Sequence, residues 1–203
     1  MRQGECIWLN LATLQDYLKA HGRGPNTKDY EIVTSFFLAK FCEGQFGRPC
    51  EVGFPIKNEL TREIPNKGYG NMAAIAHIMK NMLDEGTPID VIISPDTDIF
   101  TVRRGVYFQL KRFGKGLADG TDPLIEYLNS TIKKKYAPAP NVTLMLLMEC
   151  TEMDTVRLRQ EFIPAEFPFQ RLMFIALAKD KKFQIGEFWP NVGINEYDLS
   201  AYL

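Results

Sequence analysis

Residues 87–114 read TPIDVIISPDTDIFTVRRGVYFQLKRFG, and this stretch decides the expected fold. Two runs rich in apolar and β-branched residues, 89–93 and 106–113, flank a segment that contains Pro95 and Gly105. Proline and glycine interrupt strands and mark turns. The pattern therefore predicts two strands that are joined by a long turn.

The chemical interest of this hairpin lies in the direction of three side chains. Side chains alternate between two faces along a strand, so Gln109 and Lys111 share one face of the second strand. An antiparallel pairing with Asp90 opposite either residue brings its carboxylate to that face. Carboxylate and amide oxygens are ligands that Mg²⁺ prefers, and a nearby lysine can orient a water or offset charge on a phosphate. The stretch therefore predicts a site for metal-assisted chemistry on phosphates.

The segment Pro88-Ile89-Asp90, followed by Gln109-Leu110-Lys111, resembles the motif of the PD-(D/E)xK nuclease superfamily. Glutamine in place of the middle acid is similar to the form in Mrr-type restriction endonucleases. The resemblance covers residues 27–150 and implies a helix, three antiparallel strands, a second helix and a further strand. It thus implies an α/β fold with a restriction-endonuclease-like central mixed β-sheet that is flanked by helices.

The resemblance also implies a role for each motif residue. Asp90, the amide oxygen of Gln109 and the backbone carbonyl of Leu110 would bind Mg²⁺ or Mn²⁺. Lys111 would position the attacking water and offset charge in the transition state. The implied activity is metal-dependent endonucleolytic hydrolysis of DNA phosphodiester bonds, in restriction or defence.

Other acidic residues leave alternatives open. The family often completes its metal site with a glutamate on the first helix, a role that Glu31 takes here and Glu43 could take instead. An equally weighted reading of Glu31 is an acid that favours the N-terminal end of the helix dipole. Asp96 also follows a proline and forms an acidic cluster with Asp98. We favour Asp90, because acids in turns usually serve turn geometry.

Basic residues near the hairpin are candidates for binding nucleic acid. Arg112 and Lys115 follow the motif and would contact phosphates, which supply affinity without sequence preference. For the run 133–135 we favour lysines that complement a helix dipole over a DNA contact. DNA is the expected partner, while RNA as a substrate and a homodimer as the assembly stay open. The competing interpretation is a non-catalytic nucleic-acid-binding or assembly protein on a nuclease-like fold.

Composition excludes several classes of protein. With 24 Lys and Arg against 25 Asp and Glu, the net charge is −1, so any basic surface must be local. The apolar run 144–148, or 142–148 with Thr143 tolerated, is far shorter than the roughly 20 residues of a membrane span, and the N-terminus lacks a signal-peptide core. We therefore expect a cytoplasmic protein without membrane association. Four cysteines lack zinc-site spacing, which favours free thiols: Cys6, Cys42, Cys50 and Cys150.

Periodicity and turn residues predict the remaining elements. The expected helices cover 10–21, 27 to Gly44 or Gly47, 71–85 and 122–135, and the strands cover 50–54, 142–148, 172–178 and 182–189. Asn10 and Asp122 are the expected N-caps. Residues 151–168 are expected to form a long connection, with Arg157 and Arg159 on one face of a short strand. The expected single domain comprises an accessory helix in 1–26, a nuclease-like core in 27–150 and a C-terminal β extension in 151–203.

Overall fold

The structure is a computed structural model that describes most of the chain. The described residues are 6–21, 27–55, 89–95, 105–114, 120–148, 153–177 and 182–198. The predicted helix over 71–85, and Lys115, Asp96 and Asp98, lie outside these residues. The chain divides into two compact units, the first made of residues 1–108 and 202–203 and the second of residues 109–201.

The first unit contains antiparallel strands and two helices. Its described elements are β1 (Cys6–Asn10), α1 (Leu11–His21), α2 (Thr27–Phe46), β2 (Glu51–Pro55), β3 (Val91–Ser94) and the beginning of β4 (Val106–Phe113). The strands pair in sequence order, with Trp8 opposite Gly53, Gly53 opposite Ile92 and Ile92 opposite Tyr107. The predicted antiparallel pairing of the two strands in the quoted stretch is confirmed. The sequence pattern does not predict β1, whose five residues run into α1 without a glycine or proline between them.

Capping residues place one end of each helix in the first unit. Oδ1 of Asn10 accepts hydrogen bonds from the N–H and the hydroxyl of Thr13, each at 2.9 Å, which confirms Asn10 as the N-cap of α1. At the end of α2, Gly47 has φ of 67° and its N–H donates to the Glu43 carbonyl at 2.8 Å. Glycine adopts this left-handed conformation without strain, so Gly47 rather than Gly44 follows the helix.

The core of the first unit is built around α2. Residues 32–39 of α2 are all buried, so this helix is enclosed rather than half exposed. Phe36 of α2, Phe54 of β2 and Ile93 of β3 are fully buried. Burying such side chains supplies about 1.5–3 kcal/mol each, so the packing of α2 against the strands stabilises this unit.

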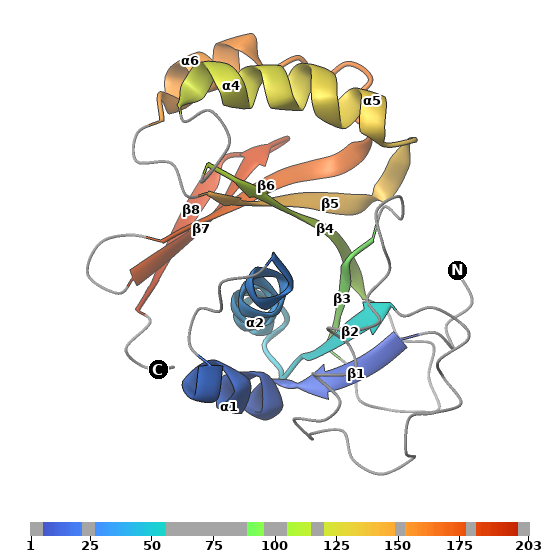
Figure 1. The fold of residues 1–203 in the computed structure, drawn as a ribbon, viewed down its shortest axis with the longest axis vertical. Coiled ribbons are helices and arrows are strands. Elements are labelled where there is room, and N and C mark those ends of the chain that lie inside the picture. Colours follow the sequence, from blue (N-terminus) through green and yellow to red (C-terminus); the bar gives the residue numbers. More distant parts are fainter. Residues whose placement is uncertain are drawn as a thin grey trace. The chain divides into compact units, whose positions relative to one another are not determined.

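The second unit contains a mixed sheet. Its described elements are the rest of β4, α4 (Thr121–Glu126), the π-helix η2 (Tyr127–Ile132), α5 (Lys133–Lys135), β5 (Ala139–Met148), α6 (Thr155–Glu161), β6 (Phe169–Leu177), β7 (Lys182–Trp189) and β8 (Gly193–Asp198). β5 and β6 run parallel, while β6, β7 and β8 pair antiparallel. Parallel neighbours need a crossover connection, which contains α6. Figure 1 shows α4, α5 and α6 over one face of the sheet. The predicted α/β class with a mixed sheet is confirmed.

The prediction of Asp122 as an N-cap is wrong. The helix begins at Thr121, one residue earlier, after Gly120 with φ of 111°, and no side chain caps it. Asp122 lies inside the first turn, where an acid favours the helix dipole. Its carboxylate forms an ion pair with the guanidinium of Arg157.

The prediction of a short strand that contains Arg157 and Arg159 is also wrong. These residues belong to α6, because the carboxylate of Asp154 accepts hydrogen bonds from the N–H groups of Val156 at 3.0 Å and Arg157 at 2.9 Å. This side-chain cap satisfies two backbone donors that a helix start leaves unpaired. In the helix the two arginines diverge: Arg157 pairs with acids, and Arg159 lies 5.9 Å from the ring centroid of Phe188.

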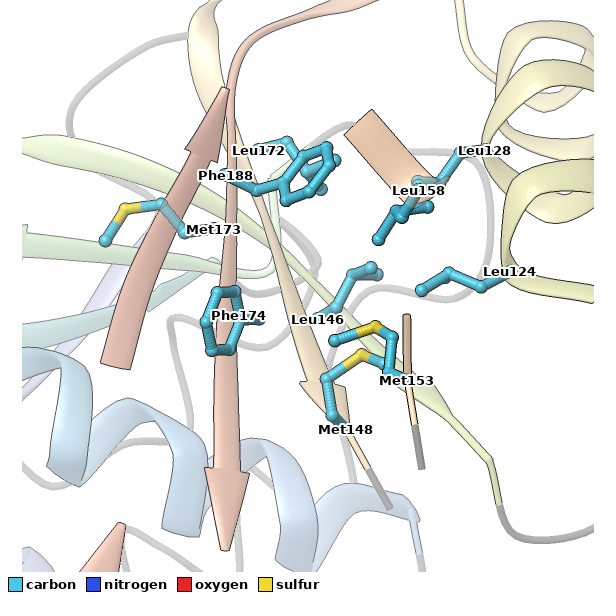
Figure 2. A pocket seen from close by; sticks show the side chains of 10 residues that line it. All are labelled: Leu124, Leu128, Leu146, Met148, Met153, Leu158, Leu172, Met173, Phe174 and Phe188. Carbon is cyan, nitrogen blue, oxygen red and sulfur yellow. The ribbon is translucent and has the colours of Figure 1, made fainter. Parts of the chain in front are cut away.

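The helices of the second unit pack against the sheet around a small apolar cavity (Figure 2). Leu146 and Met148 of β5 and Phe188 of β7 line it together with Leu124 of α4 and Leu158 of α6. The free volume is about 10 Å³, which is room for one water at most. Because the lining is apolar, a water there would lack hydrogen-bond partners. The cavity is a packing gap and not a ligand site.

Several other sequence predictions are confirmed. Residues 142–148 of β5 are all buried, as their apolar run predicts, and β6 and β7 form the predicted hairpin. Cys42 and Cys50 are free and buried. Within the described ranges, none of the helices combines the length and apolar character that a membrane crossing requires. The division into an accessory helix, a core and an extension stays a prediction.

Candidate metal and phosphate site

Asp90 lies in the first unit, directly before β3. Its N–H donates a hydrogen bond to the carbonyl oxygen of Phe108 at 2.9 Å, and its side chain is half-buried. Val91, the first residue of β3, stands opposite Phe108 in the strand register. The hydrogen bond from Asp90 therefore extends the pairing by one residue before β3. The backbone of Asp90 is therefore anchored to the residue that precedes Gln109.

Gln109 is the first residue of the second unit, and its side chain is buried. Its side chain is 1% exposed, and Nε2 donates to the carbonyl oxygen of Leu110 at 3.4 Å. A donor–acceptor distance of 3.4 Å is long for a hydrogen bond, so this contact is weak. Gln109 shares its face of β4 with Lys111, as the alternation of side chains predicts.

Lys111 lies over an aromatic ring of the second unit. Its Nζ lies 5.8 Å from the ring centroid of Tyr136, within the range of a cation–π interaction. Phe113, two residues further on the same face of β4, packs with Tyr127 of η2 at 5.6 Å between ring centroids. The face of β4 that carries the predicted catalytic lysine therefore turns toward the helical segment that contains η2 and α5.

Burial changes the acidity of Tyr127. Desolvation raises the pKa of its phenol, the positive charge of Lys111 opposes this shift, and Tyr136 adds to it. The net result is a pKa above the ordinary value of a tyrosine. Tyr127 is therefore a protonated hydroxyl at neutral pH, able to donate a hydrogen bond.

The two glutamates predicted on α2 differ in their surroundings. Glu31 is half-buried, and its backbone carbonyl accepts a hydrogen bond from the Ser35 hydroxyl at 2.5 Å. Glu43 bonds the Lys40 ammonium at 2.9 Å and the Cys50 N–H at 3.1 Å. Glu43 thus ties the end of α2 to the beginning of β2. Burial, together with the negative charge of Glu43, raises the pKa of Cys50 to about 11, so this thiol is not a nucleophile at neutral pH.

Of the two basic residues predicted to contact nucleic acid, the structure describes Arg112. It is half-buried on β4, and the alternation of side chains puts it on the face opposite Lys111. Lys115, together with the alternative acids Asp96 and Asp98, lies outside the described residues.

The predicted metal ligands fit a hard cation in their chemistry. A carboxylate, an amide oxygen and a backbone carbonyl are the oxygen donors that Mg²⁺ prefers. The Leu110 carbonyl accepts a weak bond from Gln109, but a carbonyl oxygen has a second lone pair for another partner. Asp90 belongs to the first unit, whereas Gln109 and Leu110 belong to the second. Nowhere in the described segments do three or more His, Cys, Asp or Glu side chains gather.

Sequence reasoning does not predict the aromatic surroundings of Lys111. Tyr127 lies inside a helix that was predicted from its leucines and isoleucines, and Tyr136 directly follows the lysine run. The alternation along β4 indicates which residues share a face with Lys111, but not which helix covers that face. No protein-family model and no curated protein matches this sequence, and no solved structure matches its fold.

Proposed function

We propose that this protein is a metal-dependent endonuclease that hydrolyses DNA phosphodiester bonds with Mg²⁺ or Mn²⁺. The observation that carries the proposal is the antiparallel pairing of β3 with β4, in which Asp90 is bonded to Phe108, directly before the Gln109-Leu110-Lys111 motif. Among the described residues, the element order also supports it: α2, the antiparallel strands β2, β3 and β4, a helical segment and β5. The predicted helix over 71–85, between β2 and β3, departs from the simplest pattern of the nuclease superfamily, in which these two strands form a hairpin.

Each motif residue would have its own part in the reaction. Asp90 would be the charged metal ligand, with the Gln109 amide and the Leu110 carbonyl as neutral ligands and Glu31 completing the shell. A bound Mg²⁺ supplies a Lewis acid that activates water and the phosphate. Lys111 would orient the attacking water and offset the charge that develops on the phosphate. Because glutamine is neutral, we expect weaker metal binding than in a site with a second acid.

A second candidate is a non-catalytic nucleic-acid-binding or assembly protein on a nuclease-like fold. The 1% exposure of Gln109 and the packing of Lys111 against Tyr136 favour it. Both side chains contribute to the packing of β4 whether or not a metal binds. In this case the protein would bind the phosphates of a nucleic acid without hydrolysing its phosphodiester bonds.

Cleavage of supercoiled plasmid DNA, measured with Mg²⁺ and with Mn²⁺, tests the proposal. Asp90→Asn and Lys111→Met should each lower the cleavage rate about 100-fold or more, because each removes a group that acts in the transition state. Asp16→Asn and Lys19→Met, on exposed positions of α1, are the matched controls. They remove the same charges and should leave the rate unchanged. A labelled RNA run in parallel identifies the preferred nucleic acid.

Gln109→Glu provides a readout that does not depend on cleavage. A carboxylate at this buried position is unfavourable until a cation neutralises it. Mg²⁺ should therefore raise the melting temperature of Gln109→Glu more than that of the wild type. Unchanged cleavage in Asp90→Asn, with folding intact by circular dichroism, contradicts the proposal. Binding of DNA without cleavage in either metal replaces the nuclease with the second candidate.

A further inference from the structure

We propose that Lys111, Lys135, Tyr136 and Tyr127 form a phosphate-binding subsite in the second unit, which holds a backbone phosphate of a nucleic-acid strand. The identity of the ligand rests on the proposed function, whereas the anion site rests on contacts within the second unit. Lys135, Tyr136 and Tyr127 have no part in the metal chemistry that is proposed above. The subsite therefore adds three residues to the interaction with substrate.

Two lysines from different elements converge on one ring. Nζ of Lys111, on β4, lies 5.8 Å from the ring centroid of Tyr136, and Nζ of Lys135, at the end of α5, lies 6.0 Å from the same centroid. Tyr136 is 7% exposed, and its ring packs with Phe169 at 5.2 Å between centroids. The ring is therefore a fixed platform, and one lysine from β4 and one from the end of α5 each lie within about 6 Å of its centre.

The charges of this cluster favour an anion. Two ammonium groups near one ring repel each other, and the ring face offsets this repulsion in part through its quadrupole. An anion between Lys111 and Lys135 would turn the repulsion into attraction. Lysine binds phosphate as a point charge, with no demand for a planar fork, so two converging lysines suit a phosphate group.

Tyr127 supplies a hydrogen-bond donor over the face of β4 that carries Lys111, because its ring packs with Phe113 on that face. Burial raises the pKa of its phenol, and the positive charge of Lys111 opposes this shift. Its ring is held by Phe113 at 5.6 Å. A protonated phenol donates to phosphate oxygens, so the subsite combines charge with one directional contact.

The three lysines at the end of the helix differ from one another, which separates a subsite from a general effect of the lysine run. Lys133 donates from Nζ to the carbonyl oxygen of Ala165 at 2.5 Å, and Lys134 is exposed. Lys135 is the member of the run whose ammonium lies over Tyr136. Lys134→Ala therefore removes the same charge one residue away and is the matched control for Lys135→Ala.

The test measures binding of a short fluorescent DNA duplex in EDTA, where no metal-dependent cleavage occurs, over a series of salt concentrations. Lys135→Ala should weaken binding and lower the slope of log affinity against log salt by about 1, because one phosphate contact is lost. Tyr127→Phe keeps the ring but removes the donor, and should weaken binding roughly fivefold. Lys134→Ala should change neither quantity. Equal losses in Lys134→Ala and Lys135→Ala would overturn the subsite.

A titration with inorganic phosphate, followed by the amide NMR signals of Lys135 and Tyr136, separates the two proposals. Shifts at these signals that Lys135→Ala abolishes support the anion site even where no DNA is cut, and the nuclease proposal alone then fails. DNA cleavage together with identical duplex binding by Lys134→Ala and Lys135→Ala leaves the nuclease and removes the subsite. If inorganic phosphate binds but Lys134→Ala and Lys135→Ala bind the duplex with equal affinity, a nucleic-acid strand is overturned as the ligand of the subsite.

Discussion

The two units place their helices by different kinds of contact. In the first unit, the contacts that cap helix ends are local: Asn10 bonds Thr13, and Gly47 bonds Glu43. In the second unit, Asp154 caps α6 locally, and further contacts join the helices to residues 32 to 34 positions away. They come from Asn129 of η2, Lys133 of α5 and Thr121 of α4, and all reach residues in or beside α6.

These long-range contacts hold the connection after α6 against the helical segment that contains η2. Asn129 is the main one, because Nδ2 donates to the Glu161 carbonyl at 2.8 Å and Oδ1 accepts from the Ile163 N–H at 2.9 Å. Lys133 adds a bond to Ala165 at 2.5 Å. The second unit thus satisfies the backbone of a connecting segment with side chains that are remote in sequence, which the helices of the first unit do not need for their caps.

The strand pairs of the two units share one kind of close contact. Substitutions at this contact should have the largest effects on the free energy of unfolding. A glycine faces an aromatic ring across a strand pair in each unit: Gly53 opposite Trp8, and Gly186 opposite Phe174. A Cβ on Gly186 would lie 2.5 Å from the Phe174 ring and 2.9 Å from the backbone oxygen of Gly193. We expect Gly186→Ala to destabilise the protein by about 2–3 kcal/mol in urea unfolding, because a backbone atom must move.

Gly53→Ala is the matched variant in the first unit. Its Cβ would lie 2.9 Å from the Trp8 ring, and the three nearest atoms all belong to that ring. Trp8 is a side chain on the first strand of the sheet and can shift, so we expect a smaller loss of about 1 kcal/mol. A larger loss for Gly53→Ala than for Gly186→Ala would contradict the view that the backbone obstacle decides the cost.

The difference in helix contacts itself is tested by an asparagine pair. Asn129→Ala removes two bonds to backbone groups of the segment that follows α6, and should lower the free energy of unfolding by about 1–2 kcal/mol. Asn10→Ala removes the cap of α1 and should cost about 1 kcal/mol. Hydrogen exchange separates the two: protection should fall near Ile163 for Asn129→Ala and near Thr13 for Asn10→Ala. Loss of protection around Thr13 in both variants would contradict separate units.

Local and remote contacts also explain which parts of the fold the sequence predicts. Asn10, the glycines after α2 and the alternation along β4 act within a few residues, so the corresponding helices and strands agree with the structure. α6 is misread because its start depends on Asp154, a single capping residue in a charged and proline-bearing stretch. Aspartate is a common N-cap residue, but the carboxylate of Asp122 forms an ion pair with Arg157, which is remote in sequence.

In the candidate site, too, the sequence predicts local features but not those that depend on residues remote in sequence. Alternation along β4 predicts one face for Gln109 and Lys111, and the pairing of β3 with β4 follows from two apolar runs. The burial of Gln109 and the position of Tyr136 over Lys111 depend on how the helical segment with η2 packs, and no periodicity within β4 carries that information. Predicting the surroundings of a side chain thus requires the tertiary structure, whereas its direction along a strand can be predicted from the sequence.

The smallest expected effect concerns an ion pair between strands of the second unit. Glu187 of β7 accepts two hydrogen bonds from the guanidinium of Arg171 on β6, at 3.0 Å and 2.5 Å. Burial alone would raise the pKa of Glu187, but the bonds and charge of Arg171 outweigh it, so the pKa lies below the ordinary value of 4.5. The unfolded chain therefore takes up the proton more readily, and the stabilisation is present above that value and is lost as the pH falls through the folded pKa.

The measurement is the free energy of unfolding from neutral to acidic pH for the wild type and Glu187→Gln. We expect the wild type to be more stable at pH 7 by less than about 1 kcal/mol, because Arg171 is partly exposed and solvent screens the pair. The difference should shrink as the pH falls below 4.5, because the unfolded chain takes up the proton first and the folded protein follows at lower pH. Glu126→Gln, which removes an exposed carboxyl from α4, is the control and should follow the wild type. A difference that stays constant down to acidic pH would show that the pair contributes by packing rather than by charge.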